Sequence, residues 1–390
     1  MTGKSLLASI ALTGILLTIA GIQTDTTAHA ELRKSDSADK LKGEIINING
    51  IDLFVVDQGQ GPAVLLLHGF PDSSELWRHQ IPSLVDAGFR IIAPDLRGFG
   101  QSARPEGVEA YQVPVILGDL VGLLDHFGVD RAHVVGHDWG AAIAWSLAAF
   151  IPDRVDHLVA LSVGHGNAFG DPSDIEQRRM SWYMLYFQFE GVAEAQLPRD
   201  DWALWRASFG EHPEQDTWFA DLSRPGALTA ALNYYRANLR PQPEPGTPQP
   251  SVVAPTMGIW SSGDVALGER QMTESANFAS TSFRYERIEG ASHWIPLDAP
   301  EQVTALLLDF LPCPDPSGAD CATSEPGDDD PSADEPQPDG ETPPISEDSG
   351  CSTAPGSPST PVTATWMFLL LGTLSLLWLH LRAHRRSREQ

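Results

Sequence analysis

Short apolar segments alternate with longer segments of helical periodicity between residues 41 and 311. Runs of Val, Ile and Leu bounded by Gly, Pro or Asp predict strands, and apolar positions three or four residues apart predict helices. The expected strands span residues 45–48, 53–56, 64–67, 90–93, 133–135, 155–162, 256–260 and 283–288. The expected helices span residues 75–86, 113–127, 139–150 and 300–310. This alternation is typical of a mostly parallel sheet covered by helices.

Two interruptions refine the pattern. Asn49 and Gly50 separate the first two expected strands, and this pair predicts a hairpin turn. The strand–helix alternation pauses at about residues 163–255, which are rich in Trp, Tyr and Phe and end in a Pro-rich stretch. An insertion at this point lies on the carboxyl edge of the sheet, where α/β proteins bind ligands. We therefore expect a helical lid over a site.

Asp138 is the candidate nucleophile. It stands in the sequence Gly-His-Asp-Trp-Gly, directly after an expected strand and before an expected helix. This is the context of a nucleophile elbow, in which small residues permit a sharp turn that projects the central side chain. A helix N-terminus favours an ionised carboxylate, which is the nucleophilic form. The alternative, an Asp that only caps the helix, remains open from this motif alone.

Two later residues complete a catalytic triad. Asp264 follows the expected strand at residues 256–260, and His293 follows the last strand and precedes the last helix. Each residue is unremarkable by itself. Their order along the chain, nucleophile then acid then His, is the order of hydrolase triads on this kind of sheet. We therefore predict that Asp138, Asp264 and His293 meet at one edge of the sheet.

Between residues 41 and 311 the chain resembles the epoxide hydrolase branch of the α/β-hydrolases. The matching segments are HGFP (68–71), DLRGFGQS (95–102), GHDWGA (136–141), WYMLYFQFEGVAEA (182–195), LNYYR (232–236), SSGD (261–264) and SHW (292–294). The resemblance implies an α/β-hydrolase fold, with a mostly parallel central sheet, helices on both faces and a helical lid inserted before the last strands. It also implies an oxyanion hole made by the backbone N–H groups of Phe70 and Trp139.

The resemblance further implies two lid tyrosines that hold an epoxide oxygen. Tyr183 matches the first position, because it precedes a Phe-Gln pair by four residues, and Tyr235 matches the second. Tyr186 and Tyr234 are neighbours that compete for these assignments. Trp139 is expected to contact the substrate as well. In the implied reaction Asp138 forms an alkyl ester with the epoxide, and water activated by His293 and Asp264 hydrolyses it to a vicinal diol.

Two other functions stay open. Haloalkane or haloacid dehalogenases share the Asp nucleophile, and Trp182 could supply a halide donor, although Phe70 occupies a loop position where such enzymes commonly have Asn. A non-enzymatic binding protein is the second alternative. No metal-ligand spacing, phosphate loop or dinucleotide motif is present in the sequence, so we expect a cofactor-free reaction on a small-molecule epoxide.

Both ends of the chain read as targeting segments. Lys4, an apolar run at residues 6–22 and Ala28-His29-Ala30 predict a signal peptide over residues 1–30. Residues 362–381 are almost continuously apolar, long enough to cross a bilayer core of about 30 Å, and an arginine-rich tail at 382–390 follows. We expect an exported protein, at the cell surface or in the periplasm, tethered by this helix or by a sorting signal processed near Cys351.

Charge is concentrated in the segment before the predicted anchor. The net charge is −27 over 390 residues, and residues 312–350 supply twelve acidic side chains and no Lys or Arg. Such a composition, rich in Pro and Ser, predicts an extended linker over residues 312–361. Because the chain is acidic overall, we do not expect it to bind nucleic acid.

Overall fold

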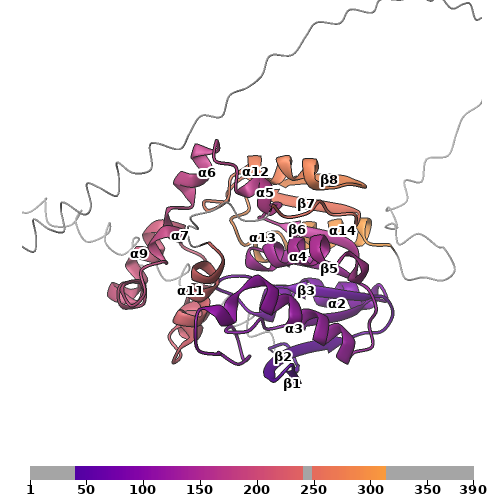
Figure 1. The fold of residues 1–390 in the computed structure, drawn as a ribbon, viewed down its shortest axis with the longest axis horizontal. Helices are drawn as coiled ribbons and strands as arrows, with labels where there is room; N and C mark the ends of the chain where they lie inside the picture. Colours follow the sequence, from indigo (N-terminus) through magenta and orange to yellow (C-terminus); the bar gives the residue numbers. More distant parts are fainter. Residues whose placement is uncertain (1–39, 240–247, 313–390) are drawn as a thin grey trace, which may run out of the picture. The chain divides into compact units, whose positions relative to one another are not determined.

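One eight-stranded sheet organises the protein, in the order β1-β2-β4-β3-β5-β6-β7-β8 (Figure 1). The computed structural model describes residues 40–239 and 248–312. Its strands are β1 (Glu44–Ile48), β2 (Ile51–Gln58), β3 (Ala63–Leu67), β4 (Arg90–Pro94), β5 (Ala132–His137), β6 (Val155–Leu161), β7 (Thr256–Ser261) and β8 (Phe283–Ile288). β1 and β2 pair antiparallel through the predicted turn, β2 and β4 pair antiparallel, and the other pairs are parallel. The eight predicted strands are all present.

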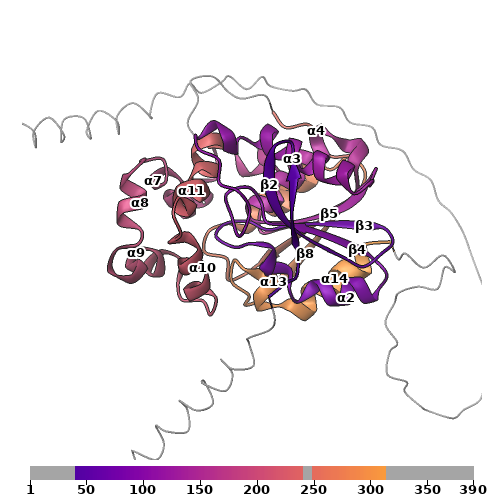
Figure 2. The same cartoon turned by 90° about the horizontal axis from the view of Figure 1, so that it is seen from below.

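Helices cover both faces of this sheet, as predicted. Helices α3 (Val113–His126) and α4 (Trp139–Phe150) lie on one face, and α2 (Gln80–Asp86) and α14 (Pro300–Phe310) lie on the other (Figure 2). The fold is therefore an α/β-hydrolase fold, with its helices in two layers around the sheet.

Strand β3 shows how the sheet divides two cores. Leu65 and Leu67 belong to the core under α3 and α4, whereas Val64 and Leu66 belong to the core under α2 and α14. Successive side chains of a strand point to opposite faces, so a run of apolar residues fills both cores at once.

The prediction of one helix over residues 75–86 was wrong. The chain instead forms a 3₁₀ turn at Ser74–Trp77 and then begins α2 at Gln80. Pro82 explains the break, because proline has no N–H and is tolerated only in the first turn of a helix. The side chain and backbone N–H of Ser74 both donate to Asp95 and hold the first segment in its own turn.

The predicted helical lid is present between β6 and β7 (Figure 1). Its helices are α5 (Gly166–Phe169), α6 (Ile175–Met180), α7 (Trp182–Tyr186), α8 (Val192–Gln196), α9 (Arg199–Phe209), α10 (Gln215–Leu222) and α11 (Ala227–Asn238). Two short helices, α12 (Glu269–Thr273) and α13 (Ile295–Asp298), follow in the main domain and were not predicted.

The predicted targeting segments lie outside the described residues. These are the signal peptide at residues 1–30, the linker beyond residue 312, the apolar helix at 362–381 and the tail at 382–390. Over residues 40–239 and 248–312, no helix combines the length and hydrophobicity needed to cross a bilayer.

A buried ion pair connects the main domain to the lid. The guanidinium of Arg97 donates to both carboxylate oxygens of Asp119 on α3 at 2.6 Å, and both side chains are buried. The carbonyl oxygen of Arg97 accepts a hydrogen bond of 2.8 Å from the hydroxyl of Tyr234 on lid helix α11. The pair therefore fixes a loop to which the lid is bonded.

We expect Asp119→Ala to lower the free energy of unfolding by about 3–5 kcal/mol, because it leaves the buried Arg97 without a counter-charge. Urea denaturation of the purified protein measures this change. The matched control is Asp57→Ala, which removes an equally bidentate but more exposed pair with Arg90. This control substitution should lower the free energy of unfolding by only about 0–1 kcal/mol. Equal losses in the two variants would contradict the assigned role of burial.

Candidate active site

Asp138 occupies a strained turn between β5 and α4. Its backbone angles are φ 52° and ψ −122°, a left-handed region that non-glycine residues rarely adopt. Gly140 permits this turn, because a Cβ atom there would overlap the carbonyl oxygens of Leu67 and His68. The sequence expectation of an elbow thus matches the observed backbone. The turn projects the side chain of Asp138 at the end of β5, where it meets the loop after β3.

The order of strands places a second loop beside this turn. β3 and β5 are neighbours, but the chain leaves β3 toward β4 and leaves β5 toward β6. The loops after these strands diverge, and such a switch point leaves a crevice at the carboxyl ends of the strands. Phe70, in the loop after β3, donates its backbone N–H to Oδ1 of Asp138 at 2.7 Å. The backbone N–H of Trp139 also bonds to Asp138.

His293 and Asp264 reach the same crevice from β8 and β7. Nδ1 of His293 lies 2.8 Å from Oδ2 of Asp264, and Nε2 lies 3.5 Å from Oδ2 of Asp138. The second oxygen of Asp264 accepts the backbone N–H groups of Ala266 and Leu267, at 2.8 and 2.9 Å. Asp264 is therefore fixed in one orientation and in turn orients the imidazole. The structure brings the three predicted triad residues together in the predicted order.

The charges of this triad are mutually dependent. Burial alone would raise the pKa of Asp138, but the hydrogen bond and positive charge of His293 outweigh it and hold the pKa below its usual value. Burial alone would lower the pKa of His293, but Asp264 and Asp138 on either side raise it to about 10. An imidazolium thus lies between two carboxylates, and Asp138 is ionised.

Tyr183 on α7 and Tyr235 on α11 cover the carboxylate of Asp138 from the lid. Their ring centroids lie 6.1 Å apart, and both side chains are buried. Burial, followed by the negative charge of Asp138, raises the pKa of each tyrosine well above its ordinary value. Both hydroxyls therefore stay protonated at neutral pH and can donate hydrogen bonds.

The competing tyrosines are placed differently. The hydroxyl of Tyr234 donates to the backbone carbonyl of Arg97 at 2.8 Å. Tyr186 packs against the half-exposed Trp182 and does not line the cavity beside Asp138. Of the four tyrosines, Tyr183 and Tyr235 are the two that line this cavity. Their catalytic role remains a prediction, as does that of the triad.

Aromatic residues of the lid and of the loop after β8 close this space. The cavity that contains Asp138, His293 and both tyrosines measures about 20 Å³, and Trp205, Phe209 and Trp294 form much of its wall. Sequence reasoning recognised that the lid is aromatic but did not assign Trp205 or Phe209 to the site. Their spacing of four residues on α9 was the available signal.

Two further buried residues support His293 from below. Nε2 of His137 and the hydroxyl of Ser162 both bond to the backbone carbonyl of His293, at 2.8 and 3.1 Å. Burial, reinforced by the nearby charge of His293, lowers the pKa of His137 to about 4, so this histidine is neutral. His137 lies inside the elbow motif, but its spacing gave no sign of this function.

Across the described ranges, no group of three or more His, Cys, Asp or Glu residues has a geometry that could hold a metal ion.

Comparison with known proteins places the chain among hydrolases. Residues 62–300 match the family described as alpha/beta hydrolase fold. The chain is 36% identical to AB hydrolase superfamily protein YfhM of Bacillus subtilis (strain 168) over 286 residues, which cover 70% of this chain and 99% of that protein. It is 34% identical over 310 residues to Epoxide hydrolase A of Mycobacterium tuberculosis (strain ATCC 25618 / H37Rv). This match covers 68% of this chain and 96% of that protein. The crystal structure of Epoxide Hydrolase A from Mycobacterium thermoresistibile superposes with a TM-score of 0.59 at 31% identity, over 69% of this chain and 98% of that one.

Proposed function

The chain belongs to the epoxide hydrolase branch of the α/β-hydrolase superfamily, and on that premise we propose that it hydrolyses epoxides to vicinal diols through an ester on Asp138. One observation carries the proposal. Oδ1 of Asp138 is held by the N–H of Phe70, while Oδ2 faces His293 beneath the two lid tyrosines. The two oxygens therefore have different surroundings and different roles.

In the first step Oδ2 of Asp138 attacks an epoxide carbon, and the bond between that carbon and the ring oxygen breaks. The ring oxygen takes a proton from Tyr183 or Tyr235, which leaves a hydroxyalkyl ester and a tyrosinate. Esterification removes the negative charge of Asp138, so the pKa of His293 falls. Its proton is then released within the site and restores the tyrosine.

In the second step the neutral His293 takes a proton from water, and the hydroxide attacks Cγ of the Asp138 ester. The developing negative charge lies on Oδ1, which already accepts the N–H of Phe70, and the N–H of Trp139 also bonds to this carboxyl group. When the intermediate collapses, the leaving oxygen takes the proton from His293 and the diol departs. The carboxylic acid of Asp138 then returns its proton to His293.

The chemistry of the nucleophile supports this reaction. A serine that opened an epoxide would form an ether, which has no carbonyl carbon for water to attack. An aspartate forms an ester that the triad can hydrolyse. Asp138 therefore suits substitution at saturated carbon.

Dehalogenation would use the same nucleophile but different donors. Trp182, the halide donor considered from sequence, is 46% exposed and lies outside the cavity wall. The buried indole nitrogens of Trp205 and Trp294 have no hydrogen-bond partner among the described residues and could donate to a halide. Halide release is therefore measured beside diol formation. The non-enzymatic alternative loses its support, because the named relatives are hydrolases.

The route of the water oxygen tests the ester mechanism. In a single turnover in ¹⁸O-labelled water, with enzyme in excess, we expect the first diol to be unlabelled and the label to enter Asp138. The reason is that the new oxygen of the diol comes from the carboxylate, which water then refills. Mass spectrometry of the diol and of the Asp138 peptide reads both products. Label in the first diol would show direct attack by water, and halide without diol would favour the dehalogenase.

The tyrosine assignment makes a separate prediction. Tyr183→Phe and Tyr235→Phe should each lower kcat for epoxide opening by about 10²-fold, because each removes a donor to the leaving oxygen. The matched control is Tyr186→Phe on the same helix as Tyr183, which should stay within about twofold of the parent. Stopped-flow or steady-state diol formation measures these rates. Equal rates in all three variants would contradict the assignment.

We also propose export and membrane tethering, supported by the sequences of residues 1–30 and 362–390. Expression of the full chain in a bacterial host should place it in the membrane fraction, accessible to protease added outside the inner membrane. A deletion of residues 362–390 should release the protein to the soluble exported fraction. Full-length protein in the cytosolic fraction would contradict the proposal.

A further inference from the structure

The space around Asp138 is strongly unequal on its two sides. The cavity that contains the carboxylate of Asp138, His293 and both lid tyrosines is small, with a volume of about 20 Å³. A second cavity also includes Asp138 and Tyr235 but is otherwise lined by different residues, and its volume is about 380 Å³. Large substituents on both epoxide carbons would need space on both sides. The structure offers space on one side.

The larger cavity has an apolar wall. Four apolar side chains line it, namely Phe169 of α5, Met184 of α7, Val163 in the loop after β6 and Leu239 directly after α11. Burying hydrocarbon against such a wall is favourable in proportion to the area removed from water.

One face of α4 leads from the nucleophile through this cavity to the surface. Trp139, Ala142, Ser146 and Phe150 recur every three or four residues and so share a face of the helix. Trp139 and Ala142 line the larger cavity, Phe150 lines a surface groove, and Ser146 lines both. At a rise of 1.5 Å per residue, this face is roughly 16 Å long.

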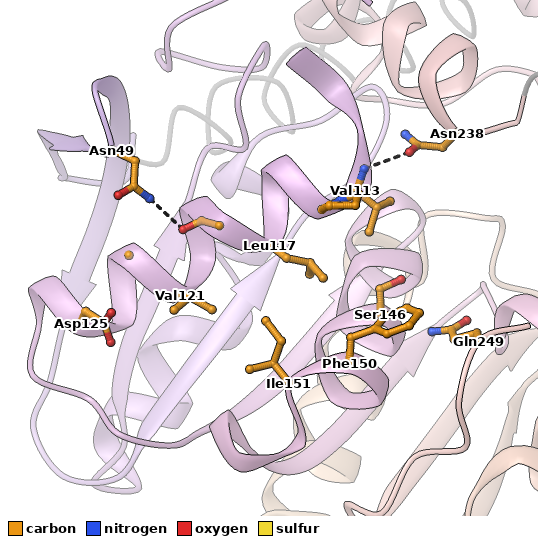
Figure 3. A pocket seen from close by; sticks show the side chains of 13 residues that line it. Asn49, Val113, Leu117, Val121, Asp125, Ser146, Phe150, Ile151, Asn238 and Gln249 are labelled. Atoms are coloured by element: carbon orange, nitrogen blue, oxygen red, sulfur yellow. Dashed lines mark hydrogen bonds between the residues drawn. The ribbon is translucent and has the colours of Figure 1, made fainter. Parts of the chain in front are cut away.

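The surface groove continues the path between α3 and α4. Figure 3 shows Val113, Leu117 and Val121 of α3 opposite Ser146, Phe150 and Ile151 near α4. The groove has a volume of about 830 Å³ and shares Val113, Asn238 and Gln249 with the larger cavity, in addition to Ser146. The two spaces therefore meet beside the N-terminus of α3.

The charges along this path are negative. Asp138 lies at its inner end and Asp125 at its outer end, and no Lys or Arg is among the described residues that line it. Arg154 is nearby but already pairs with Asp125 at 2.8 Å. A chain that ended in a carboxylate would find no cation here and would meet Asp125 instead.

We propose that this path binds the single long, uncharged alkyl chain of a terminal epoxide, with the epoxide ring at Asp138 and the chain along α4 toward the α3–α4 groove. The inference rests on the proposed function and specifies its substrate class. Because the cavity beneath the two lid tyrosines is small, the second epoxide carbon carries only hydrogens.

A substrate series tests the proposal with the full-length protein. We expect kcat/KM to rise by about three- to fourfold per added methylene from 1,2-epoxybutane to 1,2-epoxyhexane, and further to 1,2-epoxydodecane until the path is filled. The isomer trans-6,7-epoxydodecane, which carries chains on both carbons, should react at least about tenfold more slowly than 1,2-epoxydodecane. The anion of 11,12-epoxydodecanoic acid should be poorer than its methyl ester.

Variants on α4 locate the chain. Ala142→Phe should lower the ratio of kcat/KM for 1,2-epoxydodecane to that for 1,2-epoxybutane by about tenfold or more, because the new ring fills the cavity. Ser146→Phe lies farther along the same face. It should lower kcat/KM for 1,2-epoxydodecane relative to 1,2-epoxybutane, but should change kcat/KM for 1,2-epoxyhexane relative to 1,2-epoxybutane less. The matched control is Ala207→Phe on the exposed face of α9, which should leave both ratios within about twofold. Ratios within one protein are independent of the fraction that folds.

The outcomes separate the two proposals. Hydrolysis of no epoxide of any length would overturn the proposed function and this inference with it. Hydrolysis that is insensitive to chain length, or faster for trans-6,7-epoxydodecane, would leave the function intact and overturn the inference. Equal losses for all substrates in Ala142→Phe would also overturn it, whereas a length-dependent loss would support it.

Discussion

The left-handed backbone of Asp138 is the constraint on which the site depends. This residue ends β5 and begins α4, and it keeps φ 52° because Gly140 lets the helix lie against the carbonyl groups after β3. The same close approach brings the N–H of Phe70 to 2.7 Å from Oδ1 of Asp138. A turn of ordinary geometry would separate the carboxylate from this donor. The strained angle is unfavourable by itself, and the packing of β3, β5 and α4 in the two cores offsets this strain.

Electrostatics in this site follow from the placement of one imidazole between two carboxylates. His293 holds Asp138 ionised, and both carboxylates hold His293 protonated. In the proposed mechanism, esterification of Asp138 would remove one of these charges and lower the pKa of His293 before the step that requires a base. The two proposed half-reactions would thus use the same histidine in two charge states. Hydrogen bonds from His137 and Ser162 to the His293 carbonyl keep the imidazole in place.

The lid contributes donors and selectivity through the same packing. Tyr235 lies next to Tyr234, whose hydroxyl bonds to Arg97, and the buried Arg97–Asp119 pair fixes that loop to α3. The position of the Tyr235 hydroxyl therefore depends in part on an ion pair in the main domain. Rings of Phe70, Trp205 and Phe209 close one side of the site, while α4 leads away on the other. The shape of the space, more than its polarity, distinguishes the two directions.

The sequence by itself determined the sheet, the elbow and the order of Asp138, Asp264 and His293, because strand periodicity and the small residues around a sharp turn are local properties. It also favoured Tyr183 and Tyr235 through motif position. The helix predicted over residues 75–86 is broken in the structure, although Pro82 is visible in the sequence. The bonds from Ser74 to Asp95 that hold the separate first turn join residues distant in the chain, so local periodicity does not reveal them. Tertiary structure alone decided how Trp205 and Phe209 close one side of the site and where the larger cavity runs. These features depend on distances between segments far apart in the chain, and no local pattern of side chains encodes such distances.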